Sequence, residues 1–176
     1  MLFRSNGEIG YYRLGLVSLQ EKNVVAAEKK FEEALTANPD YVDPLAILSR
    51  IYFNQKNPEK AIARINQQIA LRPAQSKFQE LLGQVYFAQK DFPNAEAAYR
   101  KAISINKDSL TAYGLLGQLF LAQKSQDKAI QEYENLLKIE PKSVQAHTIL
   151  GSIYETQNSL EKAKFHYQEV LKIDQN

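Results

Sequence analysis

Residues 113–143 read YGLLGQLFLAQKSQDKAIQEYENLLKIEPKS, and residues 79–109, which lie 34 places earlier, read QELLGQVYFAQKDFPNAEAAYRKAISINKDS. The two stretches share LLGQ, AQK and an alanine twelve residues after the glycine. A near-copy at a fixed spacing of roughly 20 to 50 residues indicates an array of stacked structural repeats. The spacing therefore points to the fold class before any single residue does.

The same spacing of 34 relates residues along the whole chain. The glycines are Gly15, Gly83, Gly117 and Gly151, with Ser49 in the gap. The alanines are Ala27, Ala61, Ala95, Ala129 and Ala163. The prolines are Pro39, Pro73 and Pro141, interrupted by Lys107 and by Gln175. These positions divide the chain into repeats 8–41, 42–75, 76–109, 110–143 and 144–176, preceded by residues 1–7 as an N-terminal extension or an added remnant.

Each repeat is predicted to form two helices. In repeat 110–143 one apolar stripe at helical spacing consists of Tyr113, Leu116, Leu119 and Phe120, and a second of Ala129, Ile130, Tyr133, Leu136 and Leu137. Pro141 ends the second helix because proline has no amide donor and clashes with the preceding turn. Residues of good N-cap type precede the second helices: Asn23, Asn57, Asp91, Ser125 and Ser159.

The glycine and alanine positions fall on opposite helices of each predicted pair. Small side chains there are expected to let the two backbones approach closely, while leucines and aromatic residues fill the surrounding space. A glycine inside a helix costs about 1 kcal/mol relative to alanine. Its recurrence in four repeats therefore indicates a packing reason.

Composition and charge exclude several classes of protein. The chain has 176 residues, with 22 basic and 20 acidic side chains and no cysteine. The charges are interleaved, so a nucleic-acid-binding basic stripe is absent, and disulfides and thiolate metal sites are excluded. The sequence contains no apolar run of about 18 residues. We therefore expect neither nucleic-acid binding nor membrane insertion.

No catalytic, cofactor or metal site is predicted. His147 stands at an aromatic position of the pattern and is interpreted as a packed core histidine. His166 and Glu169 have metal-like i, i+3 spacing, but further ligands are lacking, so a solvated surface pair is predicted. Phosphate-binding loops and nucleophile motifs are missing from the sequence. The chain is therefore predicted not to be an enzyme.

A known family shares this pattern. Repeat 110–143 carries, in order, Tyr113, Leu116, Gly117, Phe120, Ala129, Tyr133, Leu136 and Pro141. These residues resemble the signature of the tetratricopeptide repeat family, with Ser18 as a departure in repeat 8–41. The resemblance covers 8–176 and implies an all-α fold, a right-handed α-α superhelix (solenoid) of antiparallel helix pairs. It also implies a groove along the first helices that binds a protein or a peptide, although fold alone does not name the partner.

The resemblance also implies which residues line the groove. They are the second, fifth, sixth, ninth, twelfth and thirteenth residues of each repeat. An apolar column flanked by amide and guanidinium groups suits an extended peptide. The predicted groove residues are Tyr12, Leu16, Leu19, Arg50, Phe53, Asn54, Lys77, Glu80, Gln84, Phe87, Gln118 and Leu121. The alternative is that aromatic residues in this column pack on neighbouring helices instead.

Three hypotheses for function remain open at this stage. The first is a scaffold that binds a partner in the groove. The second is a self-assembly module, because terminal repeats of a solenoid expose a face that a neighbour would cover. Residues of that face near the C-terminus are Tyr167, Val170, Leu171 and Ile173. The third is an accessory domain of a larger enzyme or export complex. The chain is interpreted as a piece of a longer protein, so its location stays open, with the cytoplasm favoured.

Overall fold

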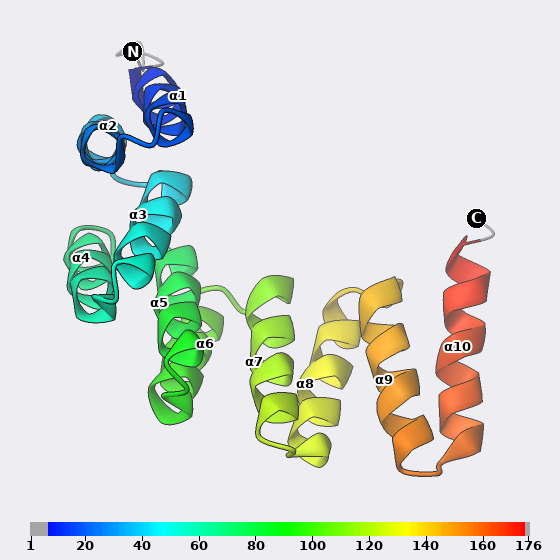
Figure 1. Ribbon diagram of the computed structural model, residues 1–176. Helices are drawn as coiled ribbons and strands as arrows, with labels where there is room; N and C mark the ends of the chain where they lie inside the picture. Colours follow the sequence, from blue (N-terminus) through cyan, green and yellow to red (C-terminus); the bar gives the residue numbers. More distant parts are fainter. Residues whose placement is uncertain (1–6, 175–176) are drawn as a thin grey trace. The chain divides into compact units, whose positions relative to one another are not determined.

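The protein consists of helices joined by short turns (Figure 1). The computed structural model describes residues 7–174, and these contain ten helices and no strand. The helices are α1 (Gly7–Gln20), α2 (Val24–Ala37), α3 (Val42–Asn54), α4 (Pro58–Leu71), α5 (Ser76–Ala88), α6 (Phe92–Ile105), α7 (Leu110–Ala122), α8 (Gln126–Ile139), α9 (Val144–Thr156) and α10 (Leu160–Asp174). Of the predicted extension 1–7, only Gly7 lies within the described residues, and it begins α1.

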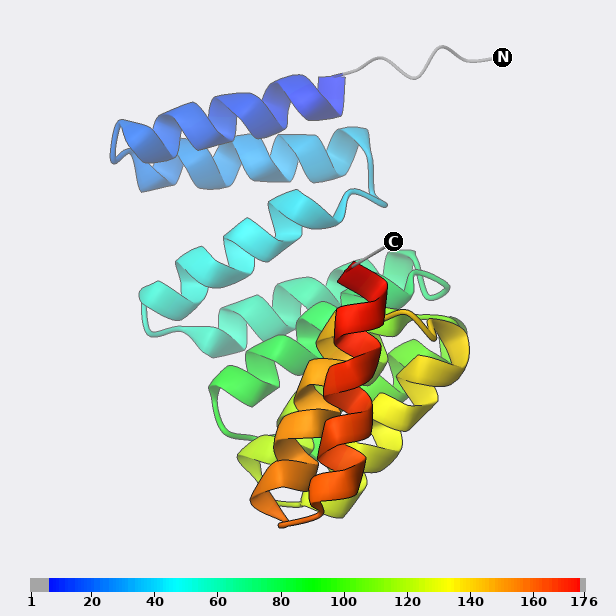
Figure 2. The same ribbon diagram turned by 90° about the vertical axis from the view of Figure 1, so that its right-hand side faces the viewer.

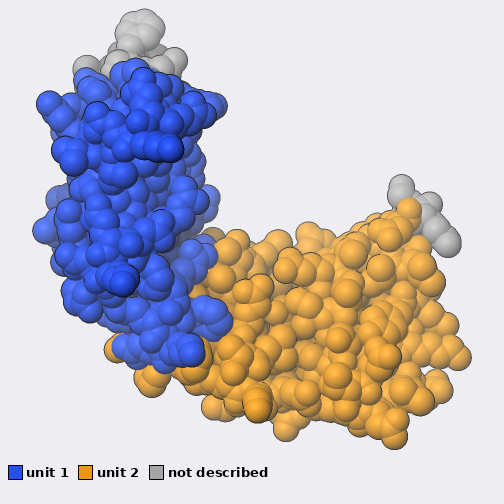
Figure 3. All heavy atoms as spheres, in the orientation of Figure 1, with its two compact units in different colours: residues 1–91 blue, residues 92–176 orange. Residues whose placement is uncertain are grey.

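The chain forms two compact units, residues 1–91 and 92–176, coloured separately in Figure 3. In the first unit each helix from α1 to α5 packs on the next, and α3 also contacts α5. In the second unit each helix from α6 to α10 packs on the next. Figures 1 and 2 show α1 beside α2 and α9 beside α10, each as an antiparallel hairpin. The all-α solenoid of antiparallel helix pairs is therefore confirmed, while the handedness of a superhelix over both units stays a prediction.

Every helix hairpin turns through a residue with left-handed backbone geometry. Lys22, Lys56, Lys90, Lys124 and Asn158 have φ values between 56° and 62°. A non-glycine residue in this conformation costs about 1–2 kcal/mol. The turn offsets this cost with a backbone bond that closes the helix end, for example from Ser125 N to Phe120 O at 2.8 Å. The same bond recurs from Asn57 N to Tyr52 O at 2.9 Å, so each repeat uses one turn geometry.

The predicted N-caps are only partly confirmed. Asn23 Oδ1 accepts a hydrogen bond from Ala26 N, and Asn57 Oδ1 accepts one from Lys60 N, both at 3.1 Å. The prediction is wrong for Ser125, whose side chain makes no capping bond. Its backbone has ψ 68°, whereas the two serines that do cap helices have ψ 94° and 98°. Asn57 caps its helix at a similar ψ of 64°, and its side chain has one more bond between Cα and the accepting oxygen than serine has. For Asp91 and Ser159 the capping role stays a prediction.

The repeated small residues lie in the core, and the glycines lie against an aromatic ring of the second helix. All five alanines of the pattern are at most 4% exposed. A Cβ atom added to Gly15 would meet the Phe31 ring at 2.5 Å, and one added to Gly117 would meet the Tyr133 ring at 2.7 Å. The glycines therefore make room for an aromatic ring sixteen residues later in the chain. Contact with this ring is the physical reason for glycine at these positions, and the spacing along the sequence did not reveal it. That the two backbones also approach closely there stays a prediction.

Candidate functional site

The first unit carries an open groove between α3 and α5. Its volume is about 320 Å³. The lining residues are Ala46, Ser49, Arg50 and Phe53 from α3, and Leu81, Gln84, Val85 and Ala88 from α5. We call this surface the α3–α5 groove. It brings together three of the predicted site residues, Arg50, Phe53 and Gln84, which come from two successive repeats.

The α3–α5 groove combines an exposed aromatic ring with polar side chains, of which only some are free to bind a partner. Phe53 is 39% exposed, although it is one of the large apolar side chains. Arg50 is exposed, and its side chain makes no hydrogen bond or ion pair with another residue in the range 7–174. Ser49 is buried, and its hydroxyl donates to Leu45 O at 2.7 Å. An apolar ring and a free guanidinium group therefore stand side by side on an otherwise aliphatic surface.

Predicted residues of the first repeat lie outside this groove. The Tyr12 ring packs against the rings of Phe31, at 5.9 Å, and Tyr41, at 5.3 Å between centroids. Leu16 and Leu19 are half-buried. Tyr12 thus takes part in packing among the aromatic rings of the first repeat. Whether this part of α1 also binds a partner stays a prediction.

The remaining predicted groove residues differ in how exposed they are. Asn54 and Lys77 are exposed, and Phe87 and Leu121 are half-buried. Glu80 is buried, with 8% of its surface exposed, and it already has an interaction partner within the protein. Its carboxylate is therefore not a free group on an open surface. Gln118 is exposed and lies in a separate pocket of the second unit.

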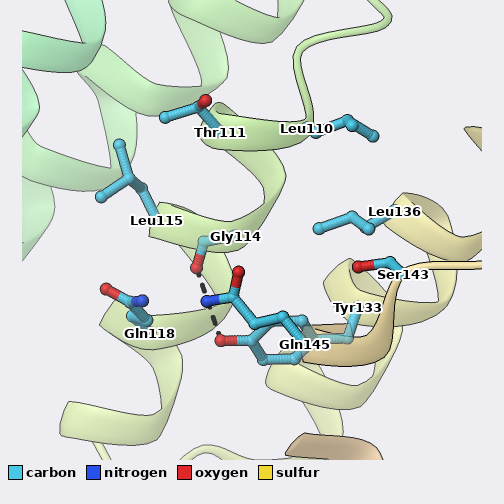
Figure 4. Close-up of a pocket in the computed structure, with 9 residues that line it drawn as sticks. All are labelled: Leu110, Thr111, Gly114, Leu115, Gln118, Tyr133, Leu136, Ser143 and Gln145. Carbon is cyan, nitrogen blue, oxygen red and sulfur yellow. Dashed lines mark hydrogen bonds between the residues drawn. The ribbon is translucent and has the colours of Figure 1, made fainter. Parts of the chain in front are cut away.

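That pocket lies among α7, α8 and the start of α9, with a volume of about 290 Å³ (Figure 4). Five lining residues come from α7: Leu110, Thr111, Gly114, Leu115 and Gln118. The others are Tyr133 and Leu136 of α8, Ser143 of the following turn, and Gln145 of α9. We call it the Gly114 pocket. Tyr133 and Leu136 were absent from the predicted groove because they belong to a second helix, whose side chains the family pattern assigns to the core.

The titratable side chain that lines the Gly114 pocket is the phenol of Tyr133. Tyr133 is 1% exposed, and burial raises its pKa to about 12. Its hydroxyl donates a long hydrogen bond, 3.5 Å, to the carbonyl oxygen of Gly114. The phenol therefore stays protonated at neutral pH and keeps its hydrogen bond to the Gly114 carbonyl.

The two histidines form a buried pair in the last repeat. His147 is 6% exposed, which confirms the prediction of a core histidine. The prediction of a solvated His166 is wrong, because this side chain is 9% exposed and its Nδ1 lies 2.9 Å from Nδ1 of His147. His147 Nε2 lies 3.1 Å from Pro141 O, which only accepts hydrogen bonds. We therefore assign the proton of His147 to Nε2 and that of the shared bond to His166. Spacing along one helix could not reveal a partner on the other helix.

This pair makes the stability of the protein sensitive to pH. Burial lowers the pKa of His166 below its ordinary 6.5, and the charge of His147 lowers it further, against the opposing carboxylates of Glu134 and Glu169. Below pH 6.5 the unfolded chain thus binds more protons than the folded one. We expect the contribution of His166 to the free energy of unfolding to be fully present above pH 6.5. It should be lost progressively as the pH falls toward the pKa of His166 in the folded protein.

Urea titrations near pH 7.5 and pH 5.5, followed by circular dichroism, measure this effect. The variant His166→Phe keeps a ring at the position, where the native imidazole stacks on Tyr154 at 5.6 Å, but has no proton to bind. It should lose much of the decrease between the two pH values. An equal decrease in both proteins would assign the pH dependence to other groups.

Other kinds of site were sought in the described part of the chain. Among residues 7–174, His, Cys, Asp and Glu side chains do not gather in a group of three or more that could hold a metal ion. In the same range, every helix is too short or too polar to cross a bilayer. The α3–α5 groove and the Gly114 pocket are the candidate binding surfaces that contain residues predicted from the sequence.

Comparisons with known proteins agree with the geometry. Models of the tetratricopeptide repeat match residues 18–85 and 144–176, and a model described as TPR repeat matches 83–124 and 117–158. Similar solved structures include a crystal structure of MamA, with 24% identity over 92% of this chain and 95% of that one, and a TM-score of 0.70. Pseudomonas aeruginosa pilF has 19% identity over 96% of this chain and 77% of that one, and a TM-score of 0.72.

A third similar structure is MamA 41-end from Desulfovibrio magneticus RS-1. It has 17% identity over 98% of this chain and 97% of that one, with a TM-score of 0.67. A comparison with curated proteins gives no match. At these identities the solved structures support the fold alone.

Proposed function

Because the chain belongs to the tetratricopeptide repeat family, whose members generally serve as protein-interaction scaffolds, we propose that it is a non-catalytic scaffold that binds a peptide or partner protein in the α3–α5 groove. The observation that carries this proposal is the exposed Phe53 ring beside the unpaired Arg50 guanidinium group. The exposed part of this ring is stabilised only when a partner removes it from water.

The chemistry of the groove indicates how a partner would bind. An apolar side chain laid against Phe53 and the aliphatic wall would gain about 25 cal/mol for each Å² removed from water. Arg50 supplies donors in a planar fork that suits a carboxylate or a carbonyl of the partner. Gln84 carries both a donor and an acceptor and can bond to the backbone of an extended peptide. The proposed ligand is therefore an extended segment with an apolar anchor.

Charge placed on the groove should abolish this binding. We expect Phe53→Glu to lose a partner that the unmodified protein captures, since a carboxylate would have to be desolvated against an apolar anchor. The matched control is Phe165→Glu on α10, because Phe165 is also an exposed aromatic residue, at 54%, and lies outside the groove. Capture from a lysate of the source organism identifies the partner, and titration calorimetry with both variants then measures its affinity.

Two outcomes would contradict the proposal. One is a partner that binds Phe53→Glu as tightly as the unmodified protein while circular dichroism shows equal helix content. The other is a partner lost equally by both glutamate variants. Either result would place the interaction away from the α3–α5 groove.

Self-association through the end faces is a second candidate, and one comparison favours it. Leu14 and Val17 are 52% and 47% exposed, whereas their counterparts 34 residues later, Leu48 and Ile51, are 0% and 7% exposed. At the other end, Leu160 and Leu171 are each 60% exposed beside a surface depression that also includes Tyr167. Of the other residues predicted there, Val170 and Ile173 are half-buried. The α1 face thus presents apolar residues that the following repeats bury, and the α10 face carries exposed leucines beside a depression.

Light scattering over a range of concentrations tests this second candidate. If the end face associates, Leu171→Glu should lower the apparent mass, while Leu71→Glu should not. Leu71 is a matched control because it is also a leucine with 60% exposure, but it lies on α4 in an internal repeat. A monomer at all concentrations would exclude self-association of the chain.

A further inference from the structure

The Gly114 pocket exists because one side chain is missing from the repeat pattern. The residues at the equivalent position in the other repeats are Tyr12, Ala46, Glu80 and Thr148. At Gly114 there is no side chain, and an added Cβ would come no nearer than 3.9 Å to Leu136 Cδ1. The backbone carbonyl of Gly114 and the hydroxyl of Tyr133 therefore stand at the wall of an open pocket.

The pocket contains no charged side chain among its nine lining residues. Its polar groups are the Gly114 carbonyl, the Tyr133, Thr111 and Ser143 hydroxyls, and two carboxamides, those of Gln118 and Gln145. An ammonium or carboxylate group entering this space would lose water without gaining an opposite charge, which is costly. The ligand group that fits is therefore uncharged.

The pocket contains side chains that each carry both hydrogen-bond donors and an acceptor. Figure 4 shows the Gln118 and Gln145 amides near the Tyr133 hydroxyl and the Gly114 carbonyl. Neither glutamine side chain makes a hydrogen bond with another residue in the part of the chain that the structure describes. Each amide offers two donor hydrogens and an acceptor oxygen. A ligand group that also carries both would pair with them, whereas an aliphatic group would leave them dehydrated and unpaired.

From this arrangement we propose that the Gly114 pocket binds the carboxamide side chain of an asparagine or glutamine in a peptide. The carboxamide accepts from one of the two glutamine amides of the pocket and donates to the oxygen of the other. The methylene groups of the side chain lie against Leu110 and Leu136. This inference rests on the proposed function in that it requires a peptide ligand, but it concerns a different unit from the α3–α5 groove.

Small uncharged and charged probes separate this proposal from its alternatives. Backbone amide signals of Gly114, Gln118 and Gln145 are followed by NMR while N-acetylglutamine amide is added. Its counterpart N-acetylglutamate amide has nearly the same shape but carries a charge, and we expect its dissociation constant to be larger by about fivefold or more. N-acetylleucine amide and N-acetyltyrosine amide test aliphatic and phenolic occupants.

Variants at the pocket verify where the probe binds. Gly114→Leu fills the space and should remove the signal changes, and Gln145→Leu should weaken binding of the glutamine probe but not of the leucine probe. Circular dichroism and thermal unfolding check that both variants fold. Equal binding of the glutamate probe, tighter binding of the tyrosine or leucine probe, or no signal change with the glutamine probe would each overturn the proposal. None of these results bears on Phe53, so failure here and failure of the proposed function are distinguishable.

Discussion

Replacement of Phe31 by alanine is expected to lower the free energy of unfolding by about 3–5 kcal/mol, the range for removing a large aromatic side chain from a core. Phe31 is 0% exposed, and its ring occupies the space beside Gly15 where a Cβ atom would lie at 2.5 Å. Gly15 has no side chain that could move into the vacated space. The cavity would therefore remain open, which places the expected loss toward the upper part of the range.

Urea titration followed by circular dichroism measures this loss. The matched control is Phe165→Ala, since Phe165 is the same residue type on a second helix but is 54% exposed. Its loss should be below about 1 kcal/mol, because surface substitutions are usually small in effect. Similar losses for the two variants would contradict the role of Phe31 as the filling of the Gly15 position.

The sequence alone was sufficient to predict the repeat, the two helices per repeat and the fold class, because these follow from periodic apolar positions. Partners that depend on two helices at once were harder to predict. The His147–His166 contact joins residues on α9 and α10, and the Gly114 pocket depends on Tyr133, a second-helix residue that reaches a space left by a missing side chain. Neither is encoded in the spacing along one helix.

One departure from the repeat pattern is a buried glutamine, and local hydrogen bonds compensate for its polar groups. Gln68 occupies a position where Ala34 and Ala102 stand in other repeats, and it is 1% exposed. Its amide donates to Pro39 O and its oxygen accepts from Arg64 Nη1 at 2.9 Å. Arg64 in turn pairs with Glu32 at 2.8 Å, although this pair is partly exposed. A buried amide is tolerated here because its donor and acceptor are both satisfied.

Ser49 is a second departure, and it is explained by the residue sixteen places later. Where the pattern has glycine, an aromatic ring follows: Phe31 after Gly15, Tyr133 after Gly117 and Tyr167 after Gly151. After Ser49 the corresponding residue is Ile65, which is buried but carries no ring. The small side chain of serine therefore fits where a ring would collide with it. The two positions form one unit of packing, and the identity of one limits the other.

This pairing makes Gly117→Ala a destabilising substitution, even though alanine is the better helix former by about 1 kcal/mol. The added Cβ would lie 2.7 Å from Tyr133 Cε2, and the ring is 1% exposed, so the ring or the backbone would have to shift out of its packed position. Overpacking of a core costs about 1–3 kcal/mol. We expect a net decrease in the free energy of unfolding, measured by urea titration.

The matched control lies one turn away on the same helix. In Gly114→Ala the new Cβ would come no nearer than 3.9 Å to Leu136 Cδ1. That variant should therefore keep the helix-forming advantage and gain up to about 1 kcal/mol. The double variant Gly117→Ser, Tyr133→Ile copies the Ser49 and Ile65 pair and should be more stable than Gly117→Ser alone, because the ring that collides is gone. If Gly117→Ala and Gly114→Ala changed stability in the same direction, the Tyr133 ring would not be the reason for glycine at position 117.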